Sequence, residues 1–227
     1  MKRLLLFDID GTLIWGGPAK GAFQLAMVET FGTAGDIDNF SFAGRTDPEI
    51  ARGLMRGTGM PDAEIEAHFE PLWERYLGYL EARLPENPVD VLPGVPALLE
   101  ALSGEEGIGM GLLTGNILRG ARLKLGSAGL LDHFHMGSYG SDHEERDELP
   151  AIALSRATEM WGVDFDPDHV VVVGDTPRDV ACGKSEGLRT LAVATGHFDT
   201  DALRATGADH VVDDFTDTAA TVSLLVA

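Results

Sequence analysis

The stretch that decides the fold is Arg3-Leu4-Leu5-Leu6-Phe7-Asp8-Ile9-Asp10-Gly11-Thr12-Leu13. Its apolar run predicts a buried β-strand over Arg3–Phe7, which ends where the first of two aspartates begins. Gly11 permits a tight turn after the strand, and the Thr12 hydroxyl can form a hydrogen bond within that turn. Carboxylates directly behind a buried strand are unusual, because an ionised group prefers water. The stretch therefore predicts both a central strand and a site at its end.

Outward from this strand, apolar runs alternate with helical patterns along the chain. Further strands are predicted over Ile108–Leu113, His169–Val173, Thr190–Ala194 and His210–Val212. Helices are predicted over Val95–Leu102, Ile117–Ala128, Leu149–Met160, Pro177–Glu186, Ala202–Ala205 and Thr218–Val226. Continuous apolar strands that alternate with helices are typical of a parallel sheet covered on both faces. The sequence therefore predicts an α/β fold with a doubly wound, Rossmann-like parallel sheet.

Residues 15–88 differ from the rest, because they contain helical patterns and no convincing strand. Helices are predicted over Gly21–Phe31, Pro48–Met55 and Pro61–Leu84. Thr46 is expected to cap the second helix with Glu49 closing a capping box, and Pro71 to break or kink the third. We predict a core domain of residues 1–14 and 89–227, with a small helical cap domain, residues 15–88, inserted after the first strand. Residues 15–18 are expected to form a flexible hinge.

Composition excludes several classes of partner. The formal charge of −20, without a lysine and arginine cluster, opposes binding to nucleic acid and to anionic membranes. No apolar run approaches the roughly 20 residues needed to cross a bilayer, and Asp8 interrupts the opening apolar run too early for a signal peptide. A single cysteine, Cys182, allows no intramolecular disulfide and fits a reducing compartment. These features predict a cytoplasmic protein.

Polar residues gather where the predicted strands end. Asp8 and Asp10 follow the first strand, Thr114-Gly115-Asn116 the second, and Asp175 and Asp179 the valine-rich third. Ligands of open α/β sheets bind at the carboxyl ends of the strands, so these side chains should converge there. Converging carboxylates repel one another unless a cation neutralises them, and hard oxygen ligands suit Mg²⁺. The sequence therefore predicts a magnesium site.

Asp8-Ile9-Asp10-Gly11-Thr12-Leu13, at the end of an N-terminal strand, resembles the first motif of the haloacid dehalogenase-like phosphatase superfamily. The resemblance implies that Asp8 is a nucleophile forming an aspartyl-phosphate and that Asp10 is the general acid and base. A carboxylate suits nucleophilic attack because it is already ionised at neutral pH. The resemblance also implies that the backbone carbonyl of Asp10 is a metal ligand. Dehalogenases lack the second aspartate, so Asp10 indicates phosphoryl transfer.

Two further segments resemble family motifs. Thr114, Gly115 and Asn116 are implied to hold phosphate oxygens, although Thr-Gly-Asn is also a common turn. Asp175 is implied to ligate Mg²⁺ directly, while Asp179 would bind it through water or orient the loop. The alternative for this acidic pair is a helix N-terminus favoured by the helix dipole.

A cationic residue, usually lysine, is the family's third motif, and this sequence departs from that pattern. Residues 142–150 contain no lysine, and Arg146 is their only arginine. Its planar fork can contact a carboxylate and a phosphate together, so Arg146 is predicted to replace the lysine. Lys184 competes for the role, but it lies two turns into the last motif's helix and should point elsewhere. An ion pair inside an acidic loop is the alternative for Arg146.

The predicted cap should select the substrate. Its position after the first motif resembles the family's helical cap type, which implies a small phosphorylated metabolite as substrate. Arg45 and Thr46 precede a capped helix and are predicted to face the core, where an arginine can bind a second anionic group. The alternative for Arg45 is a surface arginine beside a helix cap.

The motifs together favour a Mg²⁺-dependent phosphatase similar to phosphoglycolate phosphatases. Two alternatives stay open. One is a β-phosphoglucomutase-like phosphotransferase, in which the phosphoryl group passes from Asp8 to a sugar. The other is a catalytically inactive regulatory protein of the same fold, which the missing lysine alone supports.

Overall fold

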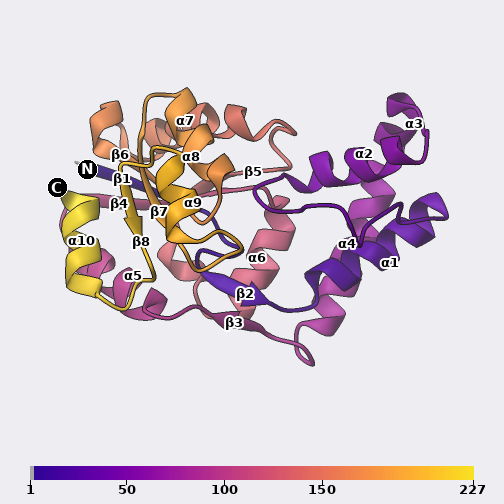
Figure 1. Ribbon diagram of the computed structural model, residues 1–227, viewed down its shortest axis with the longest axis horizontal. Helices are drawn as coiled ribbons and strands as arrows, with labels where there is room; N and C mark the ends of the chain where they lie inside the picture. Colours follow the sequence, from indigo (N-terminus) through magenta and orange to yellow (C-terminus); the bar gives the residue numbers. More distant parts are fainter. Residues whose placement is uncertain (1–2) are drawn as a thin grey trace.

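A computed structural model describes residues 3–227. Its centre is a six-stranded sheet in the order β5-β4-β1-β6-β7-β8, with every neighbouring pair parallel (Figure 1). The strands are β1 (Arg3–Phe7), β4 (Ile108–Thr114), β5 (Met136–Tyr139), β6 (Val170–Gly174), β7 (Arg189–Val193) and β8 (His210–Val212). The architecture confirms the predicted α/β class and the doubly wound parallel sheet.

The strand β1 lies in the middle of the sheet because its side chains are apolar on both faces. Leu4, Leu5, Leu6 and Phe7 have no exposed surface. Phe7 pairs with Leu112 of β4 on one side and with Val173 of β6 on the other. The carboxyl ends of β1, β4 and β6 therefore lie side by side at one edge of the sheet.

Helices cover the two faces of the sheet. Leu5 and Phe7 pack with α5, α6 and α10 on one face, while Leu4 and Leu6 pack with α7 and α8 on the other. The core helices are α5 (Val95–Gly104), α6 (Leu118–Ser127), α7 (Leu149–Trp161), α8 (Pro177–Ser185), α9 (Thr200–Ala205) and α10 (Thr218–Val226). Short 3₁₀ turns occur at η1 (Leu131–His133), η2 (Arg146–Glu148) and η3 (Pro167–His169). None of the helices described over residues 3–227 has both the length and the apolarity that a membrane crossing demands.

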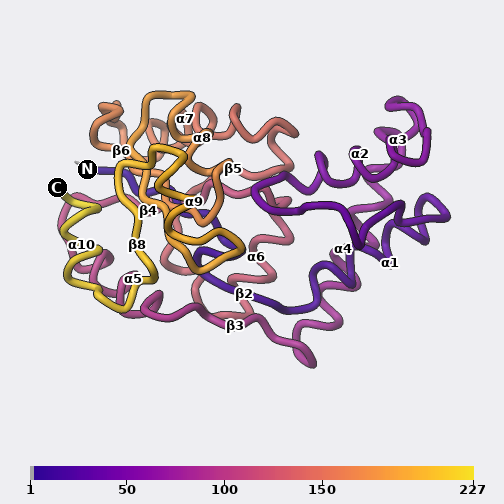
Figure 2. The backbone as a smooth tube through the Cα atoms, in the orientation of Figure 1, coloured from indigo at the N-terminus to yellow at the C-terminus, as the bar shows by residue number. Residues whose placement is uncertain are grey.

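Four helices lie beside the sheet, at the right of Figures 1 and 2, and they come from the region predicted as the cap. They are α1 (Ala19–Phe31), α2 (Asp47–Gly57), α3 (Asp62–Ala67) and α4 (Phe69–Arg83). The predicted break at Pro71 is wrong, because the chain breaks at His68, between α3 and α4. Pro71 lies in the first turn of α4, where the missing N–H would have no helical partner anyway.

The chain passes twice between the sheet and the helical region, and a short antiparallel ladder pairs these two segments. Ile14 of β2 (Ile14–Gly16) pairs with Val91 of β3 (Val89–Val91), and Gly16 pairs with Val89. The expectation of no strand in this region is therefore wrong. Each strand has only three residues, one of which is glycine or aspartate, so neither is recognisable without its partner. Of the predicted domain boundaries, the one after residue 14 falls within β2 and the one after residue 88 falls directly before β3.

The N-terminus of α2 contacts the core. Thr46 caps α2 as predicted, since its hydroxyl accepts the Glu49 N–H at 3.2 Å and donates to the Glu144 carbonyl at 2.6 Å. The Glu49 carboxylate does not complete a capping box, but pairs with Arg45 and with Arg178 of α8.

The buried Asp47 forms hydrogen bonds with the loop that precedes α6. Its N–H donates to the Gly115 carbonyl at 2.8 Å, and its carboxylate accepts the Ile117 N–H at 2.8 Å. Burial raises the pKa of Asp47 to about 6, and Asp10 adds to this, while Lys124 and the Ile117 N–H oppose it.

Replacing Asp47 with asparagine should keep the hydrogen bond and remove the cost of a buried charge. A carboxyl whose folded pKa is raised binds more protons in the folded state, so its contribution to stability falls as pH rises from about 4 to about 6. We expect Asp47→Asn to match the wild type at pH 4 and to be more stable above pH 6, by on the order of 1–3 kcal/mol. Urea unfolding at both pH values measures this.

The matched control is Asp47→Ala, which leaves the Ile117 N–H without its acceptor. It should be less stable than Asp47→Asn by about 1–3 kcal/mol. Equal losses of stability in the two variants at pH 7.5 would contradict this account of Asp47.

Candidate active site

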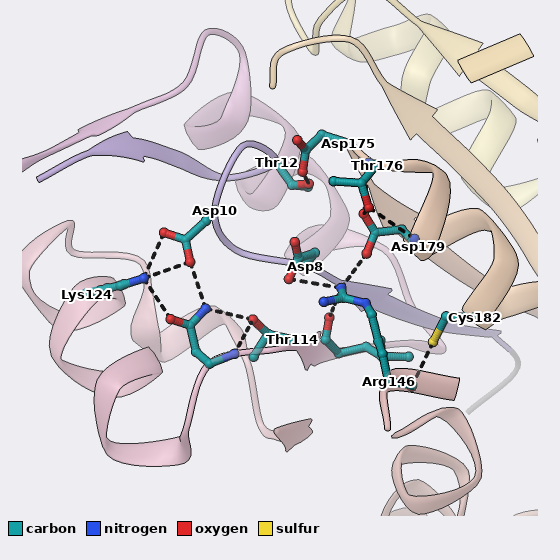
Figure 3. Close-up of polar contacts among 12 residues, drawn as sticks. Asp8, Asp10, Thr12, Thr114, Lys124, Arg146, Asp175, Thr176, Asp179 and Cys182 are labelled. Carbon is teal, nitrogen blue, oxygen red and sulfur yellow. Dashed lines mark hydrogen bonds and ion pairs between the residues drawn. The ribbon is translucent and has the colours of Figure 1, made fainter. Parts of the chain in front are cut away.

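Three acidic side chains meet at the edge of the sheet where β1 and β6 end. Asp8, Asp175 and Asp179 each place one carboxylate oxygen within 4.8 Å of the others, and all three are buried. Figure 3 shows Asp8 beyond β1 and Asp175 and Asp179 beyond β6. The predicted convergence of strand-end carboxylates is therefore present for these three residues.

The Asp8 carboxylate is buried beside a single cation. Its Oδ1 lies 3.3 Å from Nη2 of Arg146, and its backbone N–H donates to the Val173 carbonyl at 2.9 Å. Burial raises the pKa of Asp8 to about 6, because the low-dielectric surroundings disfavour its charged form. Arg146 opposes this rise, and Asp179 and Asp10 reinforce it.

The Asp175 carboxylate packs against the turn after β1. Oγ1 of Thr12 donates to its Oδ1 at 3.2 Å. Gly11 has a φ of +89°, and a Cβ there would lie 2.3 Å from Oδ2 of Asp175, so only glycine fits. Burial, with Asp179 and Asp8 nearby, raises the pKa of Asp175 to about 9. A cation bound beside this carboxyl would oppose the rise, because it favours the charged form.

Asp179 is held by two sets of hydrogen bonds. Its Oδ2 accepts the N–H of Thr176 at 2.9 Å and the Thr176 hydroxyl at 2.7 Å, and the Thr176 side chain completes a capping box for α8. Its Oδ1 pairs with Arg146. Both oxygens therefore have protein partners, which suits the orienting role considered for Asp179.

Arg146 lies where the sequence predicted a cation. Its side chain is buried, and Nη2 contacts Asp8 and Asp179 and lies 3.5 Å from the Leu113 carbonyl. Although burial lowers the pKa of Arg146, Asp179 and Asp8 outweigh this and raise it above its ordinary value. Lys184, the competing candidate, instead donates to the Gly207 carbonyl.

The Thr114-Gly115-Asn116 segment lines the same cavity as Asp8. Nδ2 of Asn116 donates to Oγ1 of Thr114 at 2.9 Å and to Oδ2 of Asp10 at 2.8 Å. A Cβ at Gly115 would lie 2.0 Å from the Arg45 carbonyl oxygen, so the cap approaches this segment closely. Because Thr114 Oγ1 accepts from Asn116, its own O–H is left as a hydrogen-bond donor.

The carboxylate of Asp10 points away from the other three acids, towards a residue that the sequence analysis missed. Lys124 donates to both Asp10 oxygens, at 2.9 and 2.8 Å, and to Oδ1 of Asn116 at 2.7 Å (Figure 3). A signal was present, because Lys124 shares one face of α6 with the buried Gly120, Ala121 and Leu125. The metal role predicted for Asp10 concerns its backbone carbonyl, which this side-chain direction does not test.

A cavity of about 650 Å³ extends from Asp8 to the cap. Aromatic side chains, Phe23, Phe40 and Phe42, form much of its cap side. Arg45 also lines it, but its guanidinium lies over the Phe40 ring at 5.2 Å and pairs with Glu49. The hydroxyl of Thr46 is occupied by the cap of α2, and its side chain is fully buried.

The chain combines a parallel α/β sheet, acidic residues at the carboxyl edge of that sheet and a helical insertion after the first strand. The haloacid dehalogenase-like hydrolase family model matches residues 2–187. The chain belongs to this family, as the resemblance implied.

Curated relatives agree with this assignment over almost the whole chain. A phosphoglycolate phosphatase of Chromobacterium violaceum is 29% identical, covering 93% of this chain and 92% of that protein. An N-acetylmuramic acid 6-phosphate phosphatase of Pseudomonas aeruginosa is 28% identical, covering 94% and 93%.

Among solved structures, a hydrolase from Pseudomonas syringae superposes with a TM-score of 0.70 at 22% identity, with full coverage of both chains. A β-phosphoglucomutase from Clostridium difficile gives 0.69 at 18% identity, covering 96% and 93%. These two likenesses concern the fold.

Proposed function

We propose that this protein is a Mg²⁺-dependent phosphatase that hydrolyses a small phosphorylated metabolite through an aspartyl-phosphate on Asp8. The observation that carries the proposal is the buried cluster of Asp8, Asp175 and Asp179 within 4.8 Å, beside Arg146 and open to a cavity beneath the cap. Family membership and relatives named as phosphatases support the same class of reaction.

The donor set fits a magnesium ion. Three carboxylates face one guanidinium, so the cluster carries excess negative charge, and oxygen donors are the ligands that Mg²⁺ prefers. Asp8 and Asp175 would hold the ion with the carbonyl of Asp10, and Asp179 would bind it through water or orient its neighbours. The bound ion would neutralise these carboxylates and the oxygens of the substrate phosphate.

The residues of the chain divide the proposed chemistry between them. An Asp8 oxygen forms a bond to phosphorus while the bond from phosphorus to the ester oxygen breaks, and Asp10 gives its proton to that departing oxygen. Asp10 then takes a proton from water, whose oxygen attacks phosphorus and releases Asp8. Thr114, Gly115 and Asn116 would hold the phosphate oxygens, and Arg146 would balance the charge of Asp8 and of the transferring group.

The substrate is proposed from the relatives and the cavity together. Phosphoglycolate is the substrate named for the relative with 29% identity, and the cavity of about 650 Å³ suits a small metabolite. We keep the predictions of a cytoplasmic protein that binds neither nucleic acid nor membranes, on the grounds of its charge and single cysteine. Arg45 stays the proposed cap residue for a second anionic group.

Replacement of the proposed nucleophile tests the enzyme class. Wild-type protein with Mg²⁺ should turn over p-nitrophenyl phosphate steadily, and Asp8→Asn should lose at least about 10³-fold in turnover, because the amide is no nucleophile. Release of nitrophenolate and phosphate measures both. Full activity in Asp8→Asn would contradict the proposal, and an inactive wild type would favour the regulatory alternative. Isomerisation of added glucose phosphates would favour the mutase.

Removal of the proposed charge-balancing group should also be costly. Arg146→Ala should lower turnover by about 10²–10³-fold, since a preorganised electrostatic group in such a site supplies several kcal/mol. The matched control is Arg156→Ala, because Arg156 lies outside the site and pairs with Asp142. Its turnover should stay near that of the wild type. Near-normal turnover in Arg146→Ala, with a normal melting temperature, would overturn the role given to Arg146.

Magnesium binding should be linked to proton release. The raised pKa values of Asp8, about 6, and Asp175, about 9, mean that Mg²⁺ must displace a proton at neutral pH. We expect the affinity of the metal-free protein for Mg²⁺ to rise between pH 6 and 9 and to fall away below pH 5. Calorimetric titration in two buffers of different ionisation enthalpy measures the protons released. An affinity independent of pH would contradict the proposed ligands.

A further inference from the structure

The side chain of Lys124 is more buried than that of most ion-paired cations in this protein. Among the ion-paired cations of residues 3–227, the side chains of Lys124 and Arg146 are 5% and 3% exposed, and the others are 12% exposed or more. Burial of an ammonium group is unfavourable unless its hydrogen bonds are all made. Arg146 has a place in the proposed chemistry, and Lys124 has none so far.

All three N–H groups of the Lys124 ammonium are used within the site. Nζ lies 2.9 Å from Oδ1 and 2.8 Å from Oδ2 of Asp10, and 2.7 Å from Oδ1 of Asn116. No donor remains for a substrate. Lys124 therefore acts on other protein groups, not directly on the phosphate.

These bonds fix a carboxylate that would otherwise be free to turn. The Asp10 side chain is 47% exposed and lies on the turn after β1. Lys124 holds both of its oxygens, and Nδ2 of Asn116 holds Oδ2 from a second direction at 2.8 Å. Asn116 is itself tied to Lys124 and to Thr114, so one buried ammonium joins the ends of β1 and β4.

We propose that Lys124 is a positioning residue that sets the direction of the Asp10 carboxylate for proton transfer. The inference rests on the proposed function, in which Asp10 serves two steps. In the first, the Asp10 proton passes to the ester oxygen as the bond from phosphorus to that oxygen breaks. In the second, Asp10 accepts a proton from the water that attacks phosphorus and releases Asp8.

The first step depends on Asp10 only when the leaving group needs a proton. Nitrophenolate is a stable anion and leaves unaided, whereas an alkoxide does not. Loss of Lys124 should therefore slow the release of an alcohol from an alkyl phosphate far more than the first release of nitrophenolate. A purely structural role would slow both releases equally.

The experiment is rapid-mixing kinetics with Mg²⁺ on Lys124→Met, which preserves the length of the side chain. With an alkyl phosphate that the wild type hydrolyses, alcohol release should fall by about 10²-fold or more. With p-nitrophenyl phosphate, the first turnover should stay within about 10-fold of the wild type, followed by a slow steady state. The ratio of the two rates does not depend on the folded fraction. The control is Lys184→Met, outside the site, which should leave both rates unchanged.

A double variant tests whether Lys124 works through Asp10. Asp10→Asn combined with Lys124→Met should be no slower than Asp10→Asn alone, because residues that act as a unit are not additive. Additive losses, equal losses on both substrates, or no loss in Lys124→Met would overturn this inference alone. A wild type that hydrolyses no phosphate ester would instead overturn the proposed function, and the inference with it.

Discussion

The structure depends on holding three carboxylates together where the fold gives them little water. Asp8, Asp175 and Asp179 lie within 4.8 Å and are buried, and their mutual repulsion opposes folding. The parallel register of β1 and β6 brings them together, because Phe7 pairs with Val173, one residue before Asp8 and two before Asp175. Burial of the apolar strands stabilises an arrangement that the acids alone would disfavour. The remaining negative charge of the cluster would favour a bound cation.

The two buried cations pair with different acidic residues of the site. Arg146 contacts Asp8 and Asp179 on one side, and Lys124 contacts Asp10 on the other. Enzymes often assign separate roles to neighbouring carboxylates by placing them in different surroundings. Here Asp8 lies in a buried cluster beside a guanidinium, whereas Asp10 is half-exposed and held by an ammonium and an amide. The whole chain has a formal charge of −20, yet its two most buried ion-paired cations among residues 3–227 lie at this one edge of the sheet. The different surroundings of Asp8 and Asp10 therefore arise from these two cations.

Much of the fold and part of the site could be predicted from sequence. Runs such as Leu4–Phe7 are strands in a covered parallel sheet whatever surrounds them, and the convergence of Asp8 with Asp175 and Asp179 follows from that sheet. The ladder of β2 and β3 was missed because each strand needs a partner more than 70 residues away. β5 was missed because Gly137 and Ser138 interrupt its apolar pattern. Lys124 was missed because lysine is normally exposed, so its position on the buried face of α6 was not weighed.

The cap and the positioning of Asp10 belong to one network, and its centre is the backbone around Asn116. Asp47 of α2 binds the residue on each side of Asn116, through the Gly115 carbonyl and the Ile117 N–H. The Asn116 side chain in turn binds Asp10 and Lys124. The approach is close enough that Gly115 tolerates no side chain beneath the Arg45 carbonyl. Residues at the start of α2, which line the cavity, therefore also bind the loop whose Asn116 side chain contacts Asp10, so the cavity wall and the Asp10 contacts depend on the same backbone.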